Sequence, residues 1–80
     1  MLLTIVTRSN VGYMNDKCSL ECDASFAIDV AKRMCEVSKD NKYVEIYQGS
    51  KLYFGDSRVK PWIKIFKDEE YRVEYQYDVL

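Results

Sequence analysis

The sequence predicts a single α+β domain, in which one helix packs on a four- or five-stranded, mainly antiparallel sheet. One segment near residue 30 repeats apolar side chains every three or four positions, the period of a helix. The C-terminal half consists of short runs rich in β-branched and aromatic residues, separated by turn-forming residues. Because 80 residues suffice for only one core, we expect residues 1–80 to form one domain of order β-α-β-β-β-β.

Residues 2–7 (LLTIVT) are predicted to form the first strand. Their apolar side chains do not alternate cleanly with polar ones, so we expect this strand to lie centrally with both faces buried. Residues 9–20 contain Asn10, Gly12, Asn15 and Asp16 and are predicted to form a loop. A short extra strand at residues 11–14 is the alternative.

The predicted helix follows Asp23, whose side chain can accept a backbone N–H bond at the helix start. A start nearer Ser19 is the alternative, and it would bring Cys18 and Cys22 together on one turn. Asn41 is expected to end the helix in a left-handed conformation. The apolar positions at helical spacing are Ala27, Val30, Ala31, Met34 and Val37.

Residues 43–48 and 51–54 are predicted to form a hairpin through the two-residue turn Gly49-Ser50. A third strand, at residues 62–66, follows Pro61. The turn sets a register, and its predicted cross-strand pairs are Tyr47 with Leu52, Ile46 with Tyr53 and Glu45 with Phe54.

The last predicted strand shows the clearest alternation in the chain, over residues 71–79. One face would carry Tyr71, Val73, Tyr75, Tyr77 and Val79. The other would carry Arg72, Glu74, Gln76 and Asp78.

The sequence lacks the residues that several kinds of catalytic, phosphate-binding and metal site need. The chain has no His, which excludes nucleophilic catalysis of the Ser-His-Asp or Cys-His type. Its three glycines are too far apart for a phosphate-binding loop. Three cysteines are too few for a structural zinc site without His ligands, and we expect all three to be reduced thiols. We therefore expect no enzymatic activity, no metal and no cofactor.

The distribution of apolar and charged residues bears on location. No apolar run exceeds three residues, so we expect no membrane span and no signal peptide, and we place the protein in the cytoplasm. The net charge is −1. Residues 49–67 carry +4 and residues 68–80 carry −4, which we interpret as neighbouring segments that neutralise each other.

The predicted strands carry two different faces. Val44, Ile46, Ile63 and Ile65 would face the helix. A helix about 10 Å across covers only two or three strands spaced about 4.8 Å apart, so part of the second face should stay uncovered. Two structural interpretations remain open. Residues 9–20 could partly close this face, or its aromatic rings could pack on neighbouring side chains while their hydroxyls reach water. The second face would carry Tyr43, Glu45, Tyr47, Leu52, Phe54, Trp62, Lys64 and Phe66.

The aromatic face leads to two functional hypotheses. The first is a non-enzymatic protein-binding module, a small regulator or inhibitor that covers a partner's functional surface, in the manner of small bacteriophage accessory proteins; this analogy rests on size and composition, not on a motif. Self-association through an edge strand or this face belongs to the same hypothesis. Its candidate contact residues are Tyr43, Tyr47, Phe54, Trp62, Lys64 and Phe66.

The alternative is a module that binds single-stranded nucleic acid or a nucleotide. Bases would stack on the aromatic side chains of the same face, and basic residues would meet the phosphates. The acidic overall composition weighs against it. Its basic candidates are Lys51, Arg58 and Lys60, together with Lys64.

Overall fold

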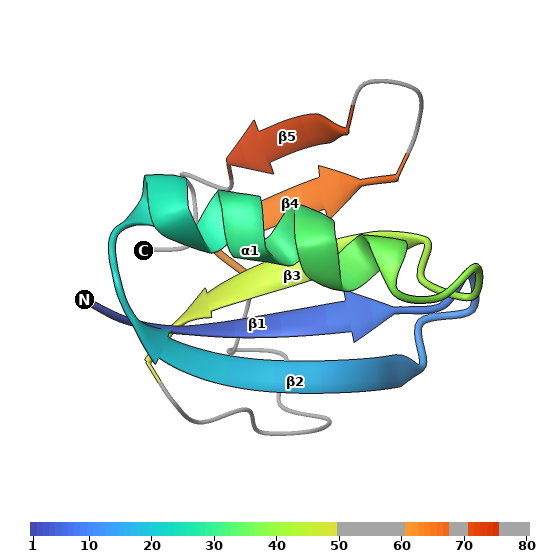
Figure 1. Cartoon of the computed structure of the whole chain (residues 1–80), viewed down its shortest axis with the longest axis horizontal. Coiled ribbons are helices and arrows are strands. Elements are labelled where there is room, and N and C mark those ends of the chain that lie inside the picture. Colours follow the sequence, from blue (N-terminus) through green and yellow to red (C-terminus); the bar gives the residue numbers. More distant parts are fainter. Residues whose placement is uncertain (50–60, 68–70, 76–80) are drawn as a thin grey trace.

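A computed structural model of the chain describes residues 1–49, 61–67 and 71–75. One helix packs on a five-stranded antiparallel sheet, which confirms the predicted class, but the element order is β-β-α-β-β-β (Figure 1). The elements are β1 (Leu2–Arg8), β2 (Met14–Glu21), α1 (Ala24–Glu36), β3 (Tyr43–Gln48), β4 (Ile63–Phe66) and β5 (Arg72–Tyr75).

The predicted loop at residues 9–20 is wrong, because most of it is strand β2. The strand pairs antiparallel with β1 and places Cys18 opposite Ile5. As an edge strand, β2 has few buried positions, so its polar composition resembles that of a loop. The alternative strand at residues 11–14 overlaps β2 only at Met14. Cys18 and Cys22 therefore do not share a helical turn.

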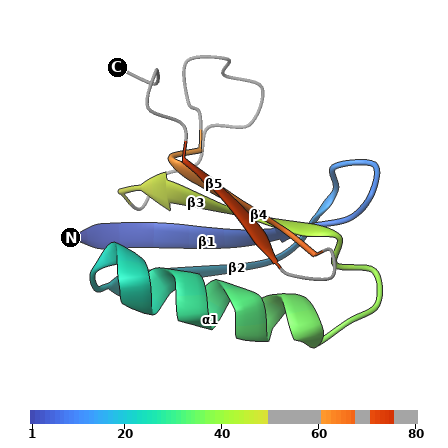
Figure 2. The same cartoon turned by 90° about the horizontal axis from the view of Figure 1, so that it is seen from above.

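The strand order is β2-β1-β3-β4-β5, with β1, β3 and β4 in the interior of the sheet. The prediction of a central first strand buried on both faces is confirmed. Its consecutive residues from Leu3 to Thr7 are all fully buried. Helix α1 crosses one face of the sheet, over β1, β3 and β4 (Figures 1 and 2).

Helix α1 begins as predicted but ends differently. The Asp23 carboxylate accepts a hydrogen bond from the Phe26 backbone N–H at 2.8 Å. The helix ends at Glu36, and its C-cap Val37 is 76% exposed and does not continue the apolar face. Asn41 is not a left-handed cap, since Tyr71 is the only non-glycine residue of the described segments with a positive φ. Asn41 is instead buried, and its side-chain amide donates to the Met34 carbonyl at 3.0 Å.

The core forms where α1 meets the sheet. As predicted, four fully buried aliphatic residues of β3 and β4 face the helix. On the helix, Ala27, Ala31 and Cys35 are the buried contacts, and their small side chains allow a close approach to the sheet. The four strand residues are Val44, Ile46, Ile63 and Ile65.

Part of the predicted hairpin is wrong and part lies outside the described residues. Ile46 pairs with Ile5 and Ile63, and Glu45 pairs with Val6 and Lys64. Both sides of these residues are thus occupied, so they cannot pair with Tyr53 and Phe54. The strand at residues 51–54, the turn through Ser50 and the pair of Tyr47 with Leu52 lie outside the described residues.

Strand β5 confirms the predicted alternation as far as the structure describes it. Tyr71 and Val73 pack against the core, while Arg72 and Glu74 are exposed on the other face. Residues 76–79 lie outside the described segments. No helix within residues 1–49, 61–67 and 71–75 is long and apolar enough to cross a membrane.

Candidate functional site

The face of the sheet that points away from α1, here called the outer face, contains most of the predicted site. Residues directly opposite each other on neighbouring strands share a face, so the register assigns its members. Figure 2 shows α1 on one side of the sheet, with the loop between β1 and β2 bending toward the other side. From β1 to β5, the outer-face residues are Thr4, Val6, Arg8, Tyr43, Glu45, Tyr47, Lys64, Phe66, Arg72 and Glu74.

The centre of the outer face is a buried polar network. The Arg8 Nε donates to Glu45 Oε1, and the Tyr47 hydroxyl donates to the same oxygen at 3.1 Å. The Arg8 Nη2 lies 3.4 Å from the Tyr47 hydroxyl oxygen. The Glu45 side chain is only 8% exposed, so these bonds compensate a carboxylate that is withdrawn from water.

The charges in this network are stable near neutral pH. Burial raises the pKa of Tyr47, so its hydroxyl stays protonated. Burial alone would lower the pKa of Arg8, but its hydrogen bonds to Tyr47 and Glu45 outweigh that effect and raise the pKa. A phenol and a guanidinium of this kind do not exchange protons at neutral pH. Tyr47 and Arg8 therefore keep their protons and act as hydrogen-bond donors that hold β1 and β3 together.

Arg8 also holds the loop between β1 and β2 against the outer face. Its Nη1 donates to the Gly12 carbonyl at 3.1 Å. Gly12 has a φ of 90°, which glycine adopts without strain, and a Cβ placed there would lie 3.7 Å from the Tyr43 hydroxyl. The interpretation that residues 9–20 partly close this face thus applies only to the short loop near Tyr43. Val11 and Tyr13 in this loop are each 74% exposed.

Beside the network lies a group of side chains, here called the Phe66 patch: Tyr43, Lys64 and Phe66, which are half-buried, and Arg72, which is exposed. The Tyr43 and Phe66 rings stack with their centroids 6.1 Å apart. The Arg72 guanidinium carbon lies 4.6 Å from the centroid of the Phe66 ring, within cation–π distance. Lys64 borders the ring pair, and its Nζ lies 3.9 Å from Glu45 Oε2. The patch combines two aromatic rings and two cations on three adjacent strands.

The structure brings three of the six predicted contact residues into this patch: Tyr43, Lys64 and Phe66. Tyr47 shares their face, but it is only 7% exposed and is engaged in the network. Phe54 lies outside the described residues, as do the basic candidates Lys51, Arg58 and Lys60.

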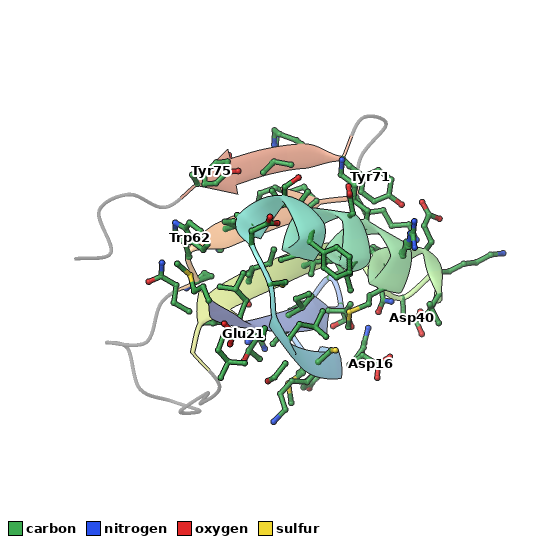
Figure 3. The ribbon with its side chains drawn as sticks, turned by 60° about the vertical axis from the view of Figure 1, so that its left-hand side comes forward. Asp16, Glu21, Asp40, Trp62, Tyr71 and Tyr75 are labelled. Carbon is green, nitrogen blue, oxygen red and sulfur yellow. The ribbon has the colours of Figure 1, made fainter. Side chains whose placement is uncertain are left out.

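The placement of Trp62 on the aromatic outer face is wrong. Trp62 packs against the core cluster and meets Tyr75 edge to face, with ring centroids 6.3 Å apart (Figure 3). Tyr75 lies opposite Ile63 and so belongs to the helix side of the sheet. Because Trp62 sits at a bend before β4, strand alternation does not determine where its side chain points.

Two functional side chains, Arg8 and Arg72, are absent from the predicted site. A signal for Arg72 existed, because the alternation in the last strand puts it on the same side as Glu74, away from the core-facing tyrosines. No comparable signal joins Arg8 to Glu45, since 37 residues separate them. Their contact depends on the pairing of β1 with β3.

The cysteines form no chemical site in the described part of the chain. All three are free thiols. Burial raises the pKa of Cys35, which disfavours the reactive thiolate. No group of three potential metal ligands occurs within the described segments.

No protein-family model, curated protein or solved structure matches this chain significantly. The functional argument therefore rests on the chemistry of the outer face.

Proposed function

We propose that this chain is a non-enzymatic protein-binding module that docks on its partner through the Phe66 patch. The observation that carries the proposal is a half-buried Phe66 ring held between Tyr43 and Arg72 on the face of the sheet that points away from α1. Aromatic and arginine side chains supply much of the binding energy at the centres of protein interfaces. A patch of this composition suits a regulator or inhibitor that covers part of a partner's surface.

The patch is also held in place before any partner arrives. Tyr43 and Phe66 lie opposite each other on β3 and β4, and Arg72 lies opposite Phe66 on β5. Side chains already in contact lose little conformational freedom on binding, which improves affinity. The buried Arg8–Glu45 pair secures β1 to β3 next to the patch.

Charge balance favours a protein over a nucleic acid as the partner. Glu45 pairs with Arg8 and lies near Lys64, and Glu74 lies opposite Lys64 on β5. Phosphate binding needs cations whose charge is not already compensated. The proposal also places the protein in the cytoplasm, where free thiols persist.

The test uses two patch variants and one matched control. The partner is first recovered by affinity purification from the native cell, and its Kd is then measured by calorimetry. Phe66→Ala and Arg72→Ala should each weaken binding by about 2 kcal/mol, which is roughly 30-fold. Phe26→Ala removes an aromatic ring that is 56% exposed on the helix, and it should leave the Kd unchanged. Urea unfolding of each variant separates lost binding from lost stability.

Two results would contradict the proposal. One is unchanged affinity in both patch variants while Phe26→Ala loses the partner. The other is tight binding of a single-stranded oligonucleotide with a steep dependence on salt, which would support the nucleic-acid alternative.

A further inference from the structure

Strand β2 forms one edge of the sheet and is eight residues long (Figure 1). Among residues 1–49, 61–67 and 71–75 it pairs with β1 on one side only. An edge strand of this length presents a row of backbone donors and acceptors to any second strand of matching shape.

The register shows which residues of β2 offer these groups. The Cys22 N–H donates to the Met1 carbonyl, so the even-numbered residues at this end of β2 direct their backbone groups toward β1. Backbone groups alternate in direction along a strand, so those of Lys17, Ser19 and Glu21 point to the free edge. All three residues are exposed.

We propose that β2 pairs antiparallel with β2 of a second copy of this chain, with Ser19 on the two-fold axis. The pairing joins two five-stranded sheets into one continuous sheet and leaves both Phe66 patches free at a distance from the new junction. This surface is separate from the proposed partner-binding patch.

Charge complementarity selects this register. With Ser19 on the axis, Lys17 of each copy lies opposite Glu21 of the other, and both side chains are on the outer face. Glu21 Oε1 lies 2.8 Å from the Met1 amino nitrogen, which leaves Oε2 for the lysine. A lysine in an edge strand usually discourages pairing, but here it meets an opposite charge.

The other face of β2 fits the same register. Cys18 and Leu20 lie on the helix side, opposite Ile5 and Leu3 of β1, and both are half-buried. With Ser19 on the axis, Cys18 of each copy meets Leu20 of the other, so apolar surface covers apolar surface. Shifting the axis to Cys18 would put Asp16 against Leu20, and shifting it to Lys17 would put two lysines together.

The experiment is a charge swap, read by sedimentation of the full chain over a range of concentrations. K17E and E21K should each weaken the dimer by at least about tenfold, because each places like charges opposite each other twice. An equimolar mixture of K17E and E21K should dimerise again, since both contacts then join opposite charges. K39E makes the same charge change at an exposed site after α1 and should dimerise like the unmodified chain.

Three results would overturn the proposal. An unmodified chain that stays monomeric at about 1 mM has no dimer of useful strength. A mixture of K17E and E21K that stays monomeric would exclude this register. F66A should dimerise like the unmodified chain, and loss of the dimer in F66A would place the interface on the Phe66 patch instead.

Discussion

At the scale of single residues, Glu45 shows how this sheet accommodates a buried charge. A carboxylate in the middle of an interior strand is costly unless it is paired and hydrogen-bonded. Arg8 reaches Glu45 from the neighbouring strand β1, and Tyr47 reaches it from two positions along the same strand. The guanidinium and the phenol thus satisfy the same carboxylate oxygen.

Replacing Glu45 should therefore cost far more stability than replacing Lys64, its neighbour on β4. Glu45→Ala leaves the Arg8 guanidinium without its anion, and we expect the free energy of unfolding to fall by about 2–4 kcal/mol. The Arg8 side chain is 17% exposed, so water recovers part of the loss. Urea denaturation of the purified variant measures the change.

Lys64→Ala is the matched control for this measurement. Its Nζ lies 3.9 Å from Glu45 Oε2 and the side chain is 33% exposed, so the expected loss is below about 1 kcal/mol. Equal losses in the two variants would mean that the Arg8–Glu45 pair does not stabilise the sheet.

At the scale of secondary-structure elements, α1 is secured by side chains at both ends. Asp23 caps the first turn. At the other end, the Asn41 amide donates to the Met34 carbonyl, and Lys67 Nζ lies 3.1 Å from the Cys35 carbonyl oxygen and 3.3 Å from that of Ser38. The last carbonyls of a helix lack the usual partner four residues further on, so these contacts add to the bond that the Val37 N–H donates to the Met34 carbonyl at 3.3 Å.

Two asparagines lie in this region, and the buried Asn41 should contribute more to stability than the exposed Asn15. Asn41→Ala removes this bond in a buried setting and leaves the Met34 carbonyl with the longer bond from the Val37 N–H at 3.3 Å, so we expect a loss of about 1–2 kcal/mol in the free energy of unfolding. Asn15 donates to Asn41 Oδ1 at 2.7 Å but is itself exposed. Asn15→Ala should therefore cost less than about 1 kcal/mol. Thermal unfolding followed by circular dichroism compares the two, and a larger loss in Asn15→Ala would refute the capping role of Asn41.

At the scale of the whole molecule, the sheet divides into an interior and two edges. Strands β1, β3 and β4 have a neighbour on both sides, whereas β2 and β5 end the sheet in the described part of the chain. Helix α1 covers the three interior strands. Local opening should therefore start at the edge strands, where the fewest backbone groups are hydrogen-bonded to a neighbouring strand.

Hydrogen exchange should reveal this division and the alternation along β2. At low protein concentration, the amides of Cys18 and Leu20 donate to β1 and should exchange at least about tenfold more slowly than those of Lys17, Ser19 and Glu21. Amides of β1 and β3 should be the slowest. Exchange measured residue by residue with NMR tests the pattern, and uniform protection along β2 would show that its outer edge is covered in the monomer.

The sequence by itself determined the features that depend on neighbouring residues in the chain. The burial of β1, the Asp23 cap and the alternation in β5 each follow from a local pattern of apolar and polar side chains. The aliphatic residues of β3 and β4 that face the helix also follow from such a pattern. These features were predictable because strand and helix periods are properties of the local backbone.

Only the tertiary structure decided which strands are neighbours and what covers each face. β2 resembles a loop in sequence and becomes a strand because β1 offers it a free edge. β3 lies between β1 and β4, which removes the predicted pairs of Glu45 and Ile46 and joins Arg8 to Glu45 instead. Tyr47 became part of the buried network and Phe66 part of a half-buried patch for the same reason: burial depends on neighbours that are distant in the chain, and local periodicity carries no information about them.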